Sequence, residues 1–173
     1  YEGVHMPKMK NKKLIKGYGK LMLRAILFLL LVFMFFTKVL FFARVEGMQM
    51  FPSLKDGDLA LGYALAKDYR PGDVVVYEAD GKQCFGRILT LAGNEVDIDG
   101  SGDVKVNGIS ESGEILYPAY DKGTLTYPCR VGQGSVFILG DYRTESRDSR
   151  TYGPVLVTRI KGKVLTILRR RGL

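Results

Sequence analysis

The chain begins with one long apolar run and continues as short apolar runs separated by turns. Residues 21–43 are almost wholly apolar, with Arg24 and Lys38 on either side of an uncharged centre. As a helix rising about 1.5 Å per residue, this segment is roughly 34 Å long, enough to cross a hydrocarbon core of about 30 Å. It predicts a transmembrane helix whose two cations reach toward opposite interfaces. A buried or interfacial helix is the alternative.

Beyond residue 44 the pattern becomes that of short strands. Seven are expected, each an apolar or alternating run bounded by turn residues, at 58–63, 73–77, 86–91, 94–99, 104–106, 135–139 and 159–168. Several short strands at this spacing predict an all-β barrel or sandwich. Residues 109–134, rich in Gly, Ser, Tyr and Pro, are expected to form a surface excursion.

The distribution of charge gives the domain organisation and an orientation. Seven basic residues precede the centre of the apolar run, and only Glu2 opposes them. The positive-inside rule then keeps the N-terminus in the cytoplasm. We therefore expect a basic cytoplasmic leader at 1–20, a transmembrane helix at 21–43 and an extracellular β domain at 44–173, in a single-pass protein of the cell membrane.

The net charge of +8 does not indicate a nucleic-acid-binding protein. Once the leader and Lys38 are set aside, basic and acidic residues nearly balance, so no basic face for a phosphate backbone is expected. Arg169 to Arg171 form a basic tail, for which a solvated terminus is favoured over contact with anionic headgroups.

Histidine and cysteine offer little chemistry. His5 is the single histidine and lies in the leader, so no histidine-based triad or zinc site is expected, and no cofactor is predicted. Cys84 and Cys129 are the two cysteines. An extracellular location permits a disulfide between them, but two separate thiols are the favoured interpretation.

Residues 45–54 carry the first of three ordered motifs, V-E-G-M-Q-M-F-P-S-L. They resemble the active-site segment V-x-G-x-S-M-x-P-T-L of type I signal peptidases, the S26 family, in which the serine is the nucleophile. Gln49 stands at that position, and Ser53 stands for the threonine. A carboxamide has no ionisable proton and cannot form an acyl-enzyme. Ser53 is expected to be structural.

Residues 84–94, C-F-G-R-I-L-T-L-A-G-N, resemble the family's strand Y-V-K-R-I-I-G-L-P-G-D, whose lysine is the general base. Here Gly86 holds the lysine's position. The resemblance therefore implies a signal-peptidase pseudoenzyme with no catalytic residues. Its former substrate cleft would include Gly47, Met48, Gln49, Met50, Phe51, Pro52, Gly86 and Ser146, although core packing is an equal alternative for Met48, Met50 and Phe51.

Residues 140–153 resemble the third family motif, G-D-N-R-x-x-S-x-D-S-R-x-F/Y-G. In active relatives the first serine of this motif, here Ser146, bonds the lysine. The resemblance implies that Asp148 and Arg150 form a structural ion pair. Tyr142 replaces the family's asparagine, which is expected to reshape the floor of the cleft.

The resemblance extends to signal-peptidase-like membrane proteins of Gram-positive pilus clusters, the SipA/LepA type, which lack the Ser-Lys dyad and are needed for pilus polymerisation. It implies a non-catalytic assembly factor or chaperone that binds pilin or sortase through the former cleft or its rim. Two alternatives are an active peptidase with a relocated nucleophile, Ser53 or Ser146, and a subunit that presents substrates to a separate peptidase. The sequence leaves the client and the oligomeric state open.

Overall fold

The computed structural model describes residues 9–112 and 116–169, with side chains from residue 17 onward. The chain divides after Val39 into two compact units. The first contains helix α1, Met9–Val39, in which Gly17–Val39 is long and apolar enough to cross a membrane although it includes Lys20, Arg24 and Lys38. At about 1.5 Å per residue this part is roughly 34 Å long, sufficient to cross a bilayer. It fits a single-pass membrane anchor, as expected.

The helix ends four residues before the apolar run does. Leu40–Arg44 forms strand β1, which pairs antiparallel with β2, and Ala43 is buried in the core of the second unit. Hydropathy alone cannot show where a membrane helix ends and a following strand begins, because a buried strand and a membrane span have the same apolar composition. In the other direction α1 begins at Met9, so part of the expected leader is helical, while residues 1–8 lie outside the described part.

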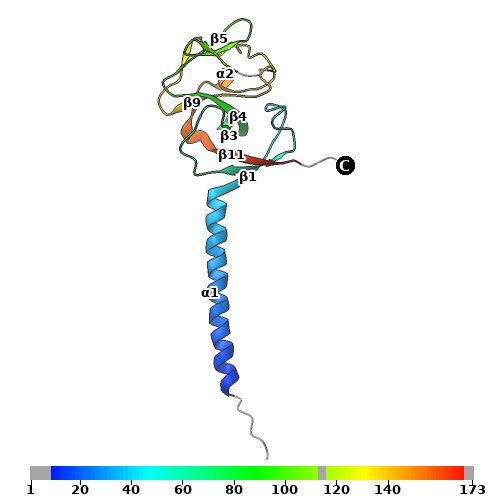
Figure 1. Cartoon of the computed structure of the whole chain (residues 1–173), viewed down its shortest axis with the longest axis vertical. Helices are drawn as coiled ribbons and strands as arrows, with labels where there is room; N and C mark the ends of the chain where they lie inside the picture. The colour runs from blue at the N-terminus through cyan, green and yellow to red at the C-terminus, as the bar shows by residue number, and fades with distance from the viewer. Residues whose placement is uncertain (1–8, 113–115, 170–173) are drawn as a thin grey trace, which may run out of the picture. The chain divides into compact units, whose positions relative to one another are not determined.

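The second unit is built from two antiparallel sheets, and Figure 1 labels several of their strands. The larger has the order β1-β2-β11-β3-β4-β9-β10, and the smaller has the order β7-β6-β5-β8. The remaining bounds are β2 Leu59–Tyr63, β3 Val74–Ala79, β4 Lys82–Leu91, β5 Glu95–Ile98, β6 Val104–Val106, β7 Ile109–Ser110, β8 Cys129–Arg130, β9 Ser135–Leu139, α2 Ser149–Tyr152, β10 Val155–Leu156, η1 Val157–Arg159 and β11 Ile160–Leu168.

The predicted all-β domain is confirmed, and all seven expected strands are present within a residue or a few of their predicted bounds. Two short strands, β7 and β8, lie inside the segment expected to be a surface excursion. With two residues each, they are too short for an alternating pattern to indicate them.

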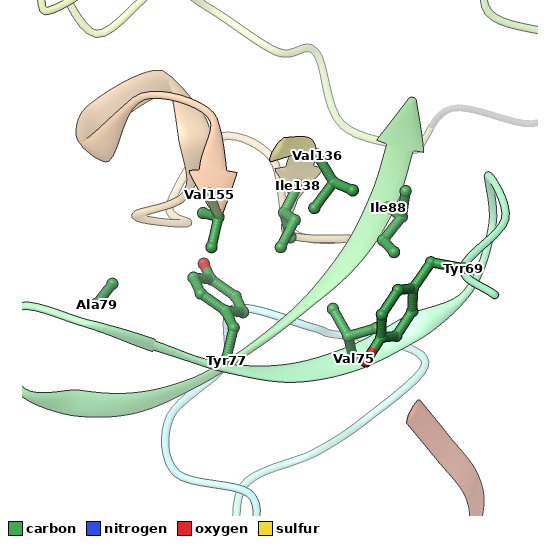
Figure 2. Packing of buried hydrophobic residues seen from close by; sticks show 8 residues of the cluster. All are labelled: Tyr69, Val75, Tyr77, Ala79, Ile88, Val136, Ile138 and Val155. Atoms are coloured by element: carbon green, nitrogen blue, oxygen red, sulfur yellow. The ribbon is translucent and has the colours of Figure 1, made fainter. Parts of the chain in front are cut away.

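Strand β3 separates two apolar clusters. Val75 and Tyr77 pack on one side with Ile88, Ile138 and Val155, while Val76 packs on the other with residues such as Met50. Figure 2 shows the first cluster, with the Tyr77 ring rising from β3 toward Val155. Because successive side chains of a strand point to opposite faces, a strand buried on both faces reads as an unbroken apolar run. The third cluster fills the space beneath the smaller sheet.

The end of β11 is tied back to the domain. The guanidinium of Arg169 donates to both oxygens of the Asp58 carboxylate, the shortest at 2.8 Å, and to the main-chain oxygen of Ser53 at 3.0 Å. The solvated state expected for this arginine is therefore wrong, because Asp58 is buried and its charge requires a partner. Residues 170 and 171 lie outside the described residues.

Candidate functional site

The loop after β1 fixes Gln49. Two hydrogen bonds tie this loop to the domain. The Val45 amide donates to the main-chain oxygen of Asp58 at 2.8 Å, and the Gly47 amide donates to the Asp56 carboxylate at 2.8 Å. Gly47 has φ of 78°, a conformation that glycine adopts without strain. The buried side chain of Met50 anchors the far end of the loop.

Gln49 itself is half-buried, and its main chain is hydrogen-bonded to the third motif. Its carbonyl accepts a hydrogen bond from the Tyr142 amide at 3.0 Å. The side-chain oxygen, Oε1, is inaccessible to solvent and has no hydrogen-bond partner among the described residues. A buried acceptor without a donor costs about 1–3 kcal/mol. The hydrogen bonds within the domain therefore do not account for a carboxamide at this position.

Gly86 lies in the middle of β4, opposite Val75 of β3, and is buried. A Cβ atom placed there would collide with Cγ2 of Ile138 and would lie 3.2 Å from Cε1 of Tyr77. Burial raises the pKa of the Tyr77 hydroxyl well above its usual value, so the phenol is neutral. The surroundings of Gly86 are therefore apolar and closely packed.

The third motif forms a buried polar network around Asp148 and Arg150, both almost completely inaccessible. The Asp148 carboxylate accepts from the Arg150 guanidinium at 2.8 and 2.9 Å, from the Gly140 amide at 3.0 Å and from the Ser146 hydroxyl at 2.7 Å. It also caps the first turn of α2 through the Arg150 amide. Such a carboxylate is satisfied on every side, which is what a buried charge requires.

Ser146 is held entirely within this network. Its hydroxyl donates to Asp148 and accepts from Arg150 at 2.9 Å, and the side chain is 0% exposed. A Cβ at Gly140 would lie 2.7 Å from the Ser146 oxygen and 2.6 Å from the Gln49 carbonyl oxygen. Gly140 thus allows the motif-one loop and the motif-three network to approach each other closely.

Two further ion pairs flank the network. Arg87 forms a two-pronged pair with Asp141 at 2.7 and 2.8 Å, which raises the pKa of the guanidinium. It also donates to the Ser53 hydroxyl at 3.3 Å. Arg143 forms a similar pair with Glu111. The Arg87 pair links the second and third motifs, and the spacing of these residues in the sequence gave no indication of it.

Tyr142, which stands where the family motif has asparagine, takes part in an aromatic cluster. Its ring packs against Tyr117, with centroids 4.5 Å apart, and against Phe51, with centroids 6.2 Å apart. An asparagine could not make these ring contacts. The aromatic group replaces a small polar side chain at this place.

A cavity of about 740 Å³ opens beside Gln49, and we call it the β1–β4 cleft. One wall is strand β1, the other is the hairpin of β3 and β4, and motif three closes it. Its lining residues are Phe42, Ala43, Arg44, Glu46, Gln49, Ala79, Asp80, Lys82, Gln83, Cys84, Arg147 and Tyr152.

Both walls of the cleft have strand edges free within the described part of the chain. Strand β1 is the first strand of its sheet and pairs with β2 alone. Residues 82–86 of β4 pair with β3, whereas the pairing of β4 with β9 starts at Arg87. An extended peptide can therefore add to either edge by main-chain hydrogen bonds.

Of the residues predicted to line the former cleft, Gln49 does so. Met50 is 1% exposed and packs in the core, so the core-packing alternative holds for it. Gly86 and Ser146 are buried beneath the surface, while Met48 is exposed and does not line this cavity. The charged wall, formed by Arg44, Lys82 and Arg147 with Glu46 and Asp80, was missed because three of these residues lie outside the motifs, and Glu46 and Arg147 stand at positions that the motifs leave variable.

Other chemistry is limited within the described residues. They contain no group of three or more His, Cys, Asp and Glu side chains able to hold a metal ion. Cys84 and Cys129 are separate free thiols. Burial raises the pKa of the Cys84 thiol, which lies in the cleft wall, and that of Cys129, which lies in the smaller sheet.

The apolar helix, the two-sheet domain and the three ordered motifs indicate a membrane-anchored, peptidase-like protein. The chain belongs to the signal peptidase family, peptidase S26, which it matches over residues 15–168. The family resemblance of the motifs is thereby confirmed.

Two relatives that match by sequence agree with this assignment. The chain is 33% identical to signal peptidase I of Bacillus caldolyticus over 136 residues, covering 69% of this chain and 74% of that protein. It is 31% identical over 132 residues to the mitochondrial ATP-independent inner membrane protease subunit 1b of Arabidopsis thaliana, covering 72% of this chain and 68% of that protein. The structure of a signal peptidase I from Enterococcus faecalis V583 aligns with 28% identity and a TM-score of 0.48, covering 58% of this chain and 98% of that chain.

Proposed function

We propose that this chain is a non-catalytic member of the family, which holds a client protein at the membrane without cutting it. The observation that carries this proposal is the identity of the residues at the two reactive positions of the motifs, Gln49 and Gly86. An amide cannot attack a carbonyl, and glycine cannot accept a proton. Removal of the nucleophile or base from a serine protease lowers turnover by roughly a factor of a million.

A relocated nucleophile is the competing explanation, and the surroundings of both candidate serines argue against it. Ser146 is inaccessible, and its hydroxyl is engaged by Asp148 and Arg150. Ser53 is exposed, but its neighbour is the Arg87 guanidinium, which stays protonated and cannot act as a base. An active peptidase using Ser53 would release a mature N-terminus from a precursor, and Ser53→Ala would abolish that release.

The β1–β4 cleft is the surface that we assign to the client. Its two free strand edges suit an extended peptide, and affinity from main-chain hydrogen bonds needs no nucleophile. Following the resemblance to pilus-cluster proteins, we propose that the client is a pilin subunit or the sortase that polymerises pilins.

The location follows from the anchor. With seven basic residues before the centre of the apolar segment, the N-terminus lies in the cytoplasm and the β domain lies on the outer face of the membrane. There the cleft would meet secreted pilins near the bilayer. A subunit that presents precursors to a separate active peptidase has the same topology, and its client would be an uncleaved precursor.

The two native thiols allow a direct test of the cleft. The full-length chain in detergent would be prepared with Cys129→Ala, which leaves Cys84 as the single thiol, and then modified with a bulky maleimide. The matched control is Cys84→Ala with the label on Cys129. We expect capture of purified pilin or sortase to be lost in the first protein and retained in the second. Equal capture by both would contradict a binding site in the cleft.

The cellular role is tested by deletion. Loss of the gene from its native strain should abolish pilus polymers while pilin signal cleavage continues. Accumulation of uncleaved pilin precursor would favour the presenting subunit instead. Normal polymers in the deletion strain would remove the pilus role.

A further inference from the structure

Gly86 not only lacks a functional group but is also closely packed against its neighbours. Strand β4 pairs this residue with Val75 of β3, the strand that carries Tyr77, and the side chain of Ile138 on β9 reaches it although the β9 pairing starts only at Arg87. An added Cβ would collide with Cγ2 of Ile138 and approach Cε1 of Tyr77 to 3.2 Å. Even the smallest side chain therefore has no room at residue 86 unless a neighbour moves.

Neither neighbour moves easily. Ile138 is 0% exposed, and its Cγ2 is bonded directly to Cβ, so a β-branched side chain cannot swing this atom away without leaving its rotamer. Tyr77 is 1% exposed and belongs to the same cluster, in which its ring stands between β3 and Val155 (Figure 2). Closely packed interiors resist added volume, so an inserted carbon atom destabilises the fold.

We propose that Ile138 and Tyr77 close the space that a lysine at residue 86 would need, and that they determine, together with Gln49 and Gly86, that this cleft does not hydrolyse its client. The inference rests on the proposed non-catalytic function and extends it to residues outside the family's reactive positions. The place of the general base has become part of the apolar core. Return of serine and lysine alone does not rebuild a peptidase here, because already the first carbon of the lysine side chain collides with Ile138.

The closure is tested by adding one carbon atom at residue 86 and removing the obstacle. The full-length chain in detergent would be made as Gly86→Ala, Ile138→Ala and the double variant, with unfolding followed by tyrosine near-ultraviolet circular dichroism. Gly86→Ala should lower Tm by roughly 5–15 °C. In the Ile138→Ala background the same change should cost less than about 3 °C, because Cγ2 is gone and the new carbon fills part of the space.

Gly132→Ala is the matched control, since a Cβ at Gly132 has no atom within 4 Å and should leave Tm unchanged. Comparison of this variant with Gly86→Ala needs no substitution of Ile138, so the test stands even if Ile138→Ala does not fold. A Gly86→Ala protein as stable as Gly132→Ala would overturn the inference. So would equal Tm losses in the two Ile138 backgrounds.

A second measurement addresses the reaction. A chain with Gln49→Ser and Gly86→Lys should fail to cleave a synthetic signal-peptide substrate and should show a lowered Tm. Cleavage by this protein with an unchanged Tm would overturn the closure. Cleavage by the unsubstituted chain would instead contradict the proposed function and leave the stability comparison unaffected, so the two failures can be told apart.

Discussion

Two neighbouring regions of the domain differ in how their polar groups are satisfied. In the network of Ser146, Asp148 and Arg150, each charged group is inaccessible and is met by several partners at 2.5–3.1 Å. In the reactive region, Gln49 has a buried oxygen without a partner among the described residues, and Gly86 offers no functional group. The two regions meet through Gly140, which contacts both.

The polar network stabilises the fold, whereas Gln49 and Gly86 stand at the positions that carry out the reaction in active relatives. A buried ion pair that has lost one partner leaves an uncompensated charge, so neither Asp148 nor Arg150 can change alone without a large loss of stability. A nucleophile and a base contribute to turnover rather than to folding, and their positions can hold other side chains in a stable domain. A peptidase scaffold can thus persist while its reactive groups do not.

The largest loss of stability is expected when the network of Ser146, Asp148 and Arg150 is disrupted. Asp148→Ala would leave the Arg150 guanidinium buried without its carboxylate and should lower the free energy of unfolding by about 3–5 kcal/mol. Denaturant unfolding of the full chain in detergent would measure it. Asp80→Asn is the control, because the pair of Asp80 with Arg147 is 3.8 Å long and mostly exposed, and asparagine tolerates the φ of 49° at this position. It should cost at most about 1 kcal/mol. Similar losses in the two variants would contradict the comparison.

A smaller loss is expected for Ser146→Ala. The hydroxyl donates one hydrogen bond and accepts another, but Asp148 and Arg150 keep their bonds to each other. The free energy of unfolding should fall by about 1–2 kcal/mol, as for loss of a buried hydrogen bond to charged groups. A loss as large as that of Asp148→Ala would show that the hydroxyl, rather than the carboxylate, holds the network.

The reactive region should tolerate substitution. Gln49→Met keeps the length of the side chain and removes the unpartnered oxygen, so the free energy of unfolding should be unchanged or rise by up to about 1 kcal/mol. The same unfolding measurement applies. A loss above about 2 kcal/mol would mean that the carboxamide supports the fold.

The smallest effect concerns a pair of mixed exposure, Asp58 with Arg169. Hydrogen bonding to Arg169 lowers the pKa of the Asp58 carboxyl below 3.8. A carboxyl with a lowered folded pKa contributes stability above its unfolded pKa, and this contribution is lost as the pH falls below about 3.8 toward the folded value. Arg169→Ala should therefore raise the midpoint of acid unfolding slightly and flatten the rise of stability with pH in this window. An unchanged acid midpoint would show that the pair does not contribute.

Much of this structure could be predicted from the sequence, because its local signals are strong. The valine run of β3 and the alternation of β5 indicate strands, and the motifs place Asp148 and Arg150 in one segment. The closure of Gly86 by Ile138 and Tyr77 could not be predicted, since 138 and 77 meet it only through sheet pairing. The charged cleft wall was missed for the same reason: Arg44 and Arg147 come from distant segments.

The boundary of the anchor shows another limit. Leu40 to Ala43 continue the apolar run, but they form β1 because β2 offers main-chain partners and the core accepts Ala43. Hydropathy records composition and not pairing, so it extended the span by four residues.

The central claim is tested most directly by incubating the purified, unsubstituted full-length chain with a pilin precursor in detergent and sequencing the N-terminus of the product. A signal peptidase I from Bacillus would serve as the positive control. The non-cleaving cleft predicts that the precursor stays intact and co-purifies with the chain. A mature N-terminus that is produced by the wild-type chain and lost with Ser53→Ala would contradict it.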